Sequence, residues 1–388
     1  MLGREPKDFD VVTDAQPETV RKLFRNARLI GRRFRLVHVR FGREIVEVAT
    51  YRAAPEAEQA AAGLELTEAG RIVRDNVYGA MEDDAWRRDF TINALYYNIA
   101  DFSVTDYVGG VADLRQGIVR VIGDPEVRLR EDPVRMLRAV RFAAKLGFKI
   151  EARTAGVLHK LAPLLRDVPP SRMFDEVIKL FQGGCALTTF EMLRHYELFG
   201  HVFPLTEEGM TREQDGFPLT LVPKALANTD TRINTGKSVT PAFLLAVFLW
   251  EPARRQADRL MERGSSPHEA FRLAAGDVLR EQARHTSIPR RFSTPMREIW
   301  ALQPRFSRRS GKHAFRFAQH ERFRAAYDFL CLRAEAGEEP AELCEWWTRF
   351  QEVDEAEAWA MVRAISPPKG RRGRSRSRKR KAATHAQE

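Results

Sequence analysis

The sequence predicts an α+β fold in which a mixed sheet with helices comes first, a long helical region follows, and a disordered basic tail ends the chain. Three observations support this prediction. Strand-like patterns occur only in about the first 125 of the 388 residues. Apolar residues at helical spacing dominate the chain beyond Asp132. Near the end, residues 369–381 contain nine basic side chains and no acidic one.

The first part of the chain combines predicted strands and helices. Three segments have the composition and alternation of strands, namely residues 33–40 (RFRLVHVR), 44–50 (EIVEVAT) and 118–122 (IVRVI). Residues 20–26 and 89–99 place apolar residues at helical spacing and are predicted to be helices. Residues 53–70 are rich in Ala and Glu with little apolar pattern, so we interpret them as a mobile insertion.

Beyond Asp132 the strand patterns nearly vanish, so we expect an all-helical region. The segments with the clearest helical periodicity are 134–146, 155–165, 172–181, 188–196, 240–248 and 314–334. Pro367 and Pro368 separate the last helical segment from the basic tail.

The net charge of +11 is concentrated in the tail, because removing its nine basic residues leaves +2 for the rest of the chain. Such a segment is too polar to pack and is expected to be disordered. A polyanion is its expected partner, and binding would weaken with salt. A solubility or targeting tail is the alternative.

Composition also excludes several classes of protein. An apolar fraction of 44% is ordinary for a globular protein. No apolar run approaches the roughly 20 residues that a membrane span needs, so we expect no membrane association. Cys185, Cys331 and Cys344 are scattered and odd in number, which indicates reduced thiols and a cytoplasmic location. The histidines show no metal-ligand spacing with these cysteines, so zinc is not expected.

Asp8 and Asp10 form an acidic pair near the start of the chain. In an extended strand both side chains point to the same face. Carboxylates are the ligands that Mg²⁺ prefers, and Glu47, on the predicted neighbouring strand, can supply a third. Taken alone the pair is weak evidence, because Asp-rich loops, calcium sites and helix caps have the same pattern.

Four segments in order change this interpretation: PKDFDVVTDA (6–15), LIGRRFRLVHV (29–39), DAWRRDFTINAL (84–95) and EDPVRMLRAVRF (131–142). Together they resemble the motifs of the class II nucleotidyltransferases, the family of the tRNA CCA-adding enzymes and the bacterial poly(A) polymerases. The resemblance is strong from Gly3 to about Phe203 and looser beyond. The second segment, FTINALYY, the segment 130–148 and the basic tail are nearest to the poly(A) polymerases.

The resemblance implies a domain order and a set of site residues. A nucleotidyltransferase head would cover residues 1–125, a helical neck 126–190, a helical body 191–365 and the tail 366–388. Asp8, Asp10 and Asp89 would be catalytic, with Mg²⁺ or Mn²⁺ on Asp8, Asp10 and Glu47. The nucleotide-binding residues would be Arg88, Asn93, Asp132, Arg135 and Arg138.

Physical arguments accompany these roles. Asp89 can accept a hydrogen bond from the ribose 2′-hydroxyl, although capping the helix after it is an alternative. Asp132 and Arg135 can accept from an exocyclic amine and donate to a ring nitrogen, which fits adenine and also cytosine. On a helix, Glu131, Arg135 and Arg138 would share one face. Asp132 before a proline can also be an ordinary N-cap.

The implied activity is template-independent addition of AMP from ATP to RNA 3′ ends, in mRNA polyadenylation and decay. The expected partners are ATP, single-stranded RNA 3′ ends of little sequence specificity, and the RNA-decay machinery. CCA addition to tRNA is one alternative. A catalytically impaired RNA-binding protein is another, because the family's Gly-Gly phosphate motif upstream of the acidic pair is missing here. We therefore expect weak activity from the chain as written.

Two basic segments are candidate RNA contacts. Residues 28–43 hold six arginines and no acid, and residues 290–316 hold eight basic residues with one acid. Aromatic residues are interleaved in the second segment, a pattern that suits single-stranded RNA but also a buried core. NTGKS at 234–238 lacks the first glycine of a phosphate-binding loop and a preceding strand, so we exclude it.

Overall fold

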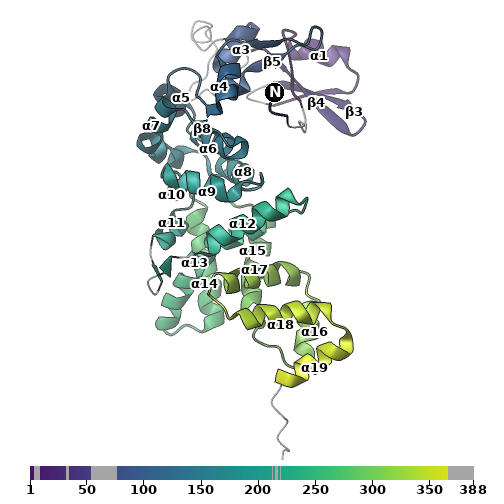
Figure 1. Ribbon diagram of the computed structural model, residues 1–388, viewed down its shortest axis with the longest axis vertical. Helices are drawn as coiled ribbons and strands as arrows, with labels where there is room; N and C mark the ends of the chain where they lie inside the picture. Colours follow the sequence, from purple (N-terminus) through teal and green to yellow (C-terminus); the bar gives the residue numbers. More distant parts are fainter. Residues whose placement is uncertain are drawn as a thin grey trace, which may run out of the picture. The chain divides into compact units, whose positions relative to one another are not determined.

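The computed structural model describes residues 1–3, 9–31, 35–53, 77–211, 213–214, 217–218 and 220–365. It divides into two compact units, Met1–Arg297 and the chain from Glu298 onward. The first unit contains the strands and most of the helices, and the second is helical where it is described (Figure 1). The predicted α+β fold is confirmed. The predicted tail, beyond residue 365, and most of the predicted insertion, at 54–76, lie outside the described residues.

A four-stranded sheet lies near the N-terminus, in the order β1-β4-β3-β2. The strands are β1 (Val11–Thr13), β2 (Ala27–Ile30), β3 (Leu36–Phe41) and β4 (Glu44–Thr50). β1 pairs with β4 in parallel, and the other pairs are antiparallel. Val20 of α1 (Pro17–Leu23) packs on one face, with the buried Val37 and Val39. The strand predicted at 44–50 is confirmed as β4. The strand predicted at 33–40 corresponds to β3, which begins at Leu36 and ends one residue later than predicted, while residues 33 and 34 lie outside the described residues.

The helix predicted at 89–99 is wrong. Residues 91–93 form the short 3₁₀ helix η1 (Thr91–Asn93), and β5 (Leu95–Tyr97) then pairs with β6 (Val104–Asp106). The alternation of β5, with Tyr96 buried between two more exposed neighbours, is a strand pattern that the apolar spacing concealed. The preceding helix is α3 (Met81–Arg87), and α4 (Gly110–Gln116) follows β6.

Short pairings connect this region with the helices that follow. β7 (Ile118–Val119) pairs in parallel with β8 (Lys149–Ile150), and Val121 forms an isolated bridge with Phe90. The extended run predicted at 118–122 is therefore confirmed in part, at Ile118, Val119 and Val121. The region beyond Asp132 is not entirely helical. Besides β8 it contains β9 (Glu213–Gln214) and β10 (Phe217–Pro218), which pair with each other.

Among the helices that follow β7 in the first unit, Phe181, Phe199, Phe203 and Phe248 form a buried aromatic core. These helices are α5 (Pro125–Glu131), α6 (Val134–Leu146), α7 (Ala152–Leu161), η2 (Ala162–Asp167), α8 (Pro170–Phe181), α9 (Ala186–His195), α10 (Phe199–Val202), α11 (Pro204–Met210), α12 (Leu221–Asn234), α13 (Pro241–Glu262) and α14 (Pro267–Gln282). The boundary between the two units falls within α15 (Arg290–Leu302). The helix predicted at 134–146 matches α6 in full.

The helix predicted at 240–248 covers less than half of α13, which continues through Pro252 to Glu262. The prediction stopped at Phe248, three residues before Glu251, where charged residues begin to alternate with apolar ones. Glu251 forms ion pairs with Arg254 and Arg255, one turn further along, and such pairs favour the helix.

The second unit contains η3 (Gln303–Arg305), α16 (Lys312–Ala318), α17 (Phe323–Glu335), α18 (Ala341–Glu352) and α19 (Glu355–Ile365). The single helix predicted at 314–334 is wrong, because α16 ends before a turn in which the Phe323 N–H donates to the His320 carbonyl at 2.8 Å. Phe306, Phe317 and Trp347 form the buried centre of the unit. The aromatic residues of 290–316 are thus largely core, which favours the second interpretation of that segment.

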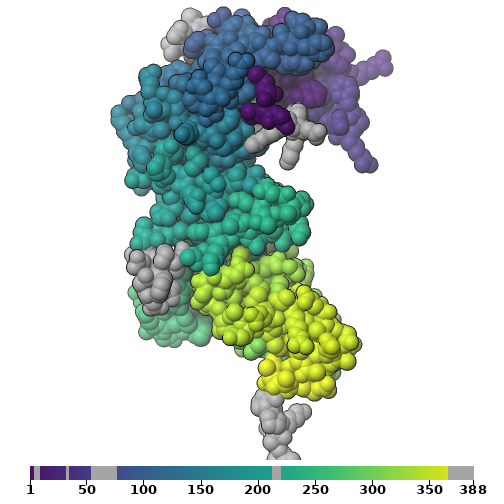
Figure 2. Space-filling view, in the orientation of Figure 1, coloured from purple at the N-terminus to yellow at the C-terminus, as the bar shows by residue number. Residues whose placement is uncertain are grey.

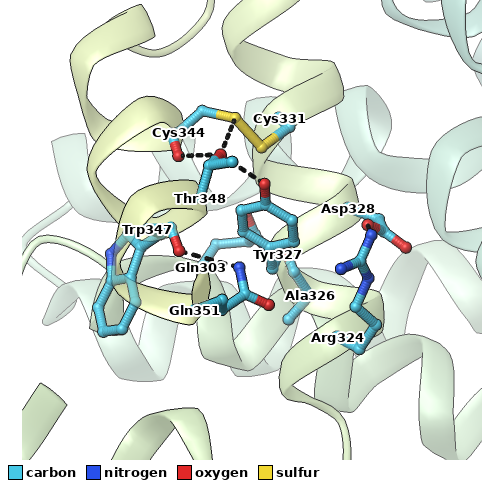
Figure 3. The surroundings of a disulfide bond; sticks show 10 residues. All are labelled: Gln303, Arg324, Ala326, Tyr327, Asp328, Cys331, Cys344, Trp347, Thr348 and Gln351. Carbon is cyan, nitrogen blue, oxygen red and sulfur yellow. Dashed lines mark hydrogen bonds and ion pairs between the residues drawn. A yellow bond between two sulfur atoms is a disulfide. The ribbon is translucent and has the colours of Figure 1, made fainter. Parts of the chain in front are cut away.

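The expectation of three reduced cysteines is also wrong. Cys331 of α17 and Cys344 of α18 form a disulfide, with their Cα atoms 5.2 Å apart (Figure 3). The two positions meet because the short α17–α18 connection turns the chain back on itself. Beside the disulfide, the Thr348 hydroxyl lies 2.6 Å from the Tyr327 hydroxyl and donates to the Cys344 carbonyl at 2.8 Å. Cys185 has a free thiol.

Across the described residues, no helix is long and apolar enough to cross a bilayer.

Two half-buried histidines, His201 and His285, are expected to make the first unit sensitive to acid. Burial, and then the charge of Arg166, lowers the pKa of His201. Burial also lowers the pKa of His285, against the opposing charge of Glu281. The unfolded chain therefore binds protons more readily, and the free energy of unfolding should fall as the pH drops through about 6.5.

The measurement is thermal unfolding between pH 5 and 8. His201→Gln should flatten the pH dependence, because the Arg166 guanidinium donates to His201 Nδ1 at 3.1 Å and an amide oxygen can also accept. His268→Gln, at an exposed position of α14, is the control and should leave the profile unchanged. Equal profiles for all three proteins would contradict the expectation.

Candidate active site

A cavity of about 630 Å³ in the first unit collects most of the residues that the sequence singled out. It is strongly polar and is lined by Asp10, Arg52, Arg87, Arg88, Asp89, Asn93, Asp132, Arg135, Arg138, Phe142, Arg172 and Glu176. These residues come from the segments just before β1 and just after β4, the α3–η1 segment, the α5–α6 connection, and the helices α6 and α8. Six arginines and four carboxylates face one space, which suits a polyphosphate with its counterions.

Asp10 lies immediately before β1, on an exposed part of the chain. The first residues lie on the surface, in dark purple in Figure 2, and neighbouring Phe9 is 70% exposed. By strand alternation Asp10 shares the sheet face of Val12, which packs against Ala85 of α3 and Ala94. Among the described residues its carboxylate has no hydrogen-bond or ion-pair partner, so it is free to bind a cation. Asp8 lies outside the described residues.

Asp89 is held from three sides. Its Oδ2 accepts from Arg138 Nε at 2.5 Å, and its Oδ1 accepts from Asn93 Nδ2 at 3.1 Å and from the Phe90 N–H at 3.0 Å. Three sequence-predicted residues, Asp89, Asn93 and Arg138, therefore form one network, although Arg138 is 49 positions from Asp89. Arg138 therefore fixes the orientation of the Asp89 carboxylate.

Arg88 is oriented by a buried carboxylate that the sequence interpretation missed. Asp84, only 2% exposed, accepts from Arg88 Nη2 at 3.1 Å, from the Tyr96 hydroxyl at 2.7 Å and from the Arg52 N–H at 3.3 Å. Burial raises the pKa of Tyr96, so its hydroxyl stays protonated and donates. Asp84 thus fixes two arginines of the cavity, Arg52 and Arg88.

Arg87 lines the same cavity, and both Arg87 and the nearby Arg128 lie close to other arginines. Burial, and then the charges of Arg52 and Arg128, lowers the pKa of Arg87 to about 10. The Arg87 guanidinium donates to the Ala53 carbonyl at 2.6 Å. Burial, and then the charge of Arg135, also lowers the pKa of Arg128. A bound anion would relieve this concentration of positive charge.

Asp132 and Arg135 both face the cavity, but each has another partner. Asp132 Oδ2 accepts from Arg172 Nη2 at 2.6 Å, and its Oδ1 accepts from the Val134 N–H at 3.3 Å. Arg135 Nη1 donates to Glu131 Oε2 at 3.0 Å and to a backbone carbonyl. The single helix assumed for Glu131, Arg135 and Arg138 is wrong, because α5 ends at Glu131 and α6 begins at Val134 after Pro133.

Comparisons with known proteins show the family to which this chain belongs. Three protein-family models match the chain: the poly A polymerase head domain at residues 1–120, the probable RNA and SrmB-binding site of polymerase A at 147–210, and the polymerase A arginine-rich C-terminus at 263–381. A poly(A) polymerase I of Escherichia coli O157:H7 is 49% identical over 385 residues, covering 98% of this chain and 83% of its own length. The chain belongs to the poly(A) polymerase family. The predicted resemblance is confirmed.

Other relatives and solved structures are similar to this chain at lower sequence identity. The poly(A) polymerase I of Haemophilus influenzae is 45% identical, over 90% of this chain and 78% of its own length. A CCA-adding enzyme of Bacillus subtilis is 36% identical over 50% of this chain and 48% of its own length. The crystal structure of the Bacillus stearothermophilus CCA-adding enzyme with CTP has a TM-score of 0.58 at 23% identity, covering 95% of this chain and 82% of that one, and it shows a shared fold.

Glu47, the third predicted metal ligand of this poly(A) polymerase family member, does not line the cavity. Its Oε1 lies 2.9 Å from His38 Nε2 on β3, and its side chain is 48% exposed. Strand alternation still puts Glu47 on the sheet face of Asp10, because Ala49 pairs with Val12. Among the described residues, no group of three His, Cys, Asp or Glu side chains is arranged to hold a metal.

Besides Asp84, the sequence interpretation missed Arg52, Arg172 and Glu176. Arg172 and Glu176 are one turn apart on α8, and both face the cavity. Their spacing of four residues within the helix predicted at 172–181 was the available signal. Arg52 lies two residues after the end of β4, and its position near the end of a predicted strand was the only signal in the sequence.

Asp84→Asn is expected to raise the KM for ATP and to lower kcat/KM by roughly 10- to 100-fold, because a displaced catalytic or binding group costs rates of this order. The neutral amide would pair poorly with Arg52 and Arg88. Tyr96→Phe should cause a smaller effect in the same direction, since it removes one donor to Asp84.

Steady-state kinetics with varied ATP, together with RNA affinity without ATP, check this positioning role. Asp83→Asn is the matched control, because Asp83 belongs to the same turn but accepts from the Ala80 N–H at 2.9 Å. If Asp84→Asn lowered the melting temperature and RNA affinity as much as the ATP parameters, Asp84 would be structural only.

Proposed function

We propose that this chain transfers AMP from ATP to the 3′-hydroxyl of RNA without a template and releases pyrophosphate. The supporting observation is that one cavity brings together Asp10, Asp89 and the Asp132–Arg135 pair from distant parts of the sequence. Phosphoryl transfer requires mainly that the reactants are positioned and that the charge of the transition state is stabilised. The six arginines and the carboxylates that line this cavity can supply both.

A divalent cation, Mg²⁺ or Mn²⁺, fits the donor set, since hard cations prefer carboxylate oxygens and Asp10 is unpartnered among the described residues. Asp8 and Asp10 would hold it, with Glu47 as a further candidate on the same sheet face. When bound, such an ion activates the attacking hydroxyl and neutralises the charge on the leaving pyrophosphate.

The residues around Asp10 would bind and orient ATP. Arg88, fixed by Asp84, would donate to the triphosphate. Asp89, oriented by Arg138 and Asn93, would accept from the ribose hydroxyl and favour a ribonucleotide. The Phe90 N–H, Asn93 and Arg138 together leave Asp89 little rotational freedom, so binding costs little further side-chain entropy.

Asp132 and Arg135 would read the base. Arg172 holds Asp132 and Glu131 holds Arg135, so the acceptor and the donor are presented in fixed positions. Only Nη1 of Arg135 is engaged among the described residues, which leaves other N–H donors for a ring nitrogen. This pair fits adenine and also cytosine, so it does not by itself distinguish AMP addition from CCA addition.

We also propose four regions along the chain: a nucleotidyltransferase head at 1–125, a helical neck at 126–190, a helical body at 191–365 and a tail at 366–388. We propose that the neck and body hold single-stranded RNA with little sequence specificity. We further propose a cytoplasmic enzyme that works with the RNA-decay machinery.

The test is incubation of the purified protein and Mg²⁺ with ATP or CTP, on a generic RNA and on tRNA lacking its terminal CCA. Long A tails on the generic RNA are expected. Incorporation of CCA on tRNA alone would replace the proposal by tRNA repair. RNA binding with no incorporation of either nucleotide would support the impaired RNA-binding protein instead.

A further inference from the structure

The second unit contains a cavity of about 290 Å³ that the proposed chemistry does not use. It is lined by Arg305, Arg308, His313, Arg316, Phe317 and His320. Its residues come from η3, from α16 and from the segments beside them. No acidic side chain lines it, and the sequence has no Asp or Glu between Glu298 and Glu321.

The three arginines of this cavity differ from their neighbours in having no acidic partner among the described residues. Arg322 pairs with Glu298 at 2.9 Å, and Arg324 pairs with Asp328 at 2.9 Å. The guanidinium groups of Arg305, Arg308 and Arg316 lie at exposed positions without such a pair. Three unneutralised charges around one cavity repel each other, and an anion placed between them would remove that cost.

The other lining groups strengthen the preference for an anion. His320 Nδ1 accepts from the Arg322 N–H at 3.1 Å, so the proton of the neutral ring is on Nε2, which can donate. Phe317 is 8% exposed and belongs to the hydrophobic core, which fixes the inner wall. The arginines therefore surround a rigid base and present planar donors, which match phosphate oxygens in pairs.

We infer that this cavity binds the phosphates of the RNA strand on which the enzyme acts. The inference rests on the proposed function, because that function makes RNA the substrate. Arginine forks around a small cavity recognise the backbone rather than the bases, which suits a tailing enzyme that accepts many 3′ ends. The volume is near the lower bound of small-ligand pockets and accommodates a phosphodiester rather than a protein segment.

The test is the salt dependence of binding to a fluorescent, 3′-blocked single-stranded RNA, measured by anisotropy without ATP. The triple variant Arg305→Gln, Arg308→Gln, Arg316→Gln should make the slope of log Kobs against log [NaCl] shallower by about 2, since each phosphate contact contributes about 0.7. The wild type should therefore lose roughly 16-fold more affinity than the variant between 50 and 200 mM NaCl.

A matched control removes the same charge elsewhere. Arg280→Gln, Arg284→Gln, Arg324→Gln replaces three exposed arginines that are already ion-paired. It should keep a slope close to that of the wild type. Equal slopes for the two triple variants would overturn the inference. Because the assay uses no ATP, its outcome is independent of whether the chain incorporates AMP.

A second measurement separates RNA phosphates from a free anion. Inorganic phosphate is titrated against both triple variants and the wild type while the melting temperature is followed. If phosphate stabilised only the proteins with an intact cavity, and the RNA slope did not change in the cavity variant, the cavity would hold a small anion and the RNA assignment would be wrong. A shallower slope with near-native melting temperatures supports it.

Discussion

Asp10→Asn should reduce the rate of AMP incorporation by at least about 100-fold, with RNA affinity unchanged. The amide keeps the volume of the carboxylate but loses the charge that a divalent cation requires. Asp10 lines the active-site cavity and has no partner among the described residues, so its replacement breaks no ion pair within them. The effect should therefore fall on kcat rather than on stability.

Primer extension with labelled RNA and saturating ATP measures this effect. Asp14→Asn is the matched control, because Asp14 is an exposed acid four residues away whose carboxylate accepts a hydrogen bond from the Thr13 hydroxyl. The double variant Asp8→Ala, Asp10→Ala extends the test to both predicted ligands. Unchanged polymerisation by these variants would end the assignment of the acidic pair to metal binding.

Replacing the base-reading pair should change which nucleotide is incorporated. Arg135→Ala and Asp132→Ala are each expected to lower the selectivity for ATP over UTP or GTP by about 10- to 100-fold. A hydrogen bond to a charged group is worth about 1.5–3 kcal/mol, and each variant removes one from the correct base. Ratios of kcat/KM for the four nucleotides on one RNA give this measurement directly.

Two further variants show whether the effect belongs to base reading. Arg130→Ala removes an exposed arginine of α5 that pairs with Glu126, and it should leave selectivity unchanged. Arg172→Gln removes the partner of Asp132 while retaining its carboxylate. If Arg172→Gln reproduced the whole selectivity change of Asp132→Ala, Asp132 would act only through that ion pair.

Local spacing was sufficient for many elements. The apolar periodicity of 134–146 predicted α6 in full, because one face of this helix is buried. The alternation of 44–50 likewise predicted β4. Two site motifs, DAWRRDFTINAL (84–95) and EDPVRMLRAVRF (131–142), could also be found in the sequence, because each is one uninterrupted segment. Where two periods competed, as at 89–99, the prediction failed, and pairing with β6 decided the strand.

The contacts that complete the site depended on packing over long sequence separations. In the sequence Asp84 looks like an ordinary acid in the first turn of α3. Its hydrogen-bond partners, however, are Arg52, which is 32 positions before it, and Tyr96, which is 12 positions after it. Arg172 reaches Asp132 across 40 positions. The Cys331–Cys344 disulfide likewise depends on how α17 and α18 pack.

The sequence by itself determined the family, the helical periodicity and most of the residues that line the cavity. Tertiary structure decided which of them touch, that the aromatic residues of 290–316 are core, and that Arg305, Arg308 and Arg316 surround one cavity. The physical reason is the sequence separation between the residues that interact. Periodicity and capping are properties of a few neighbouring residues, whereas ion pairs between distant segments exist only after the helices and strands have packed.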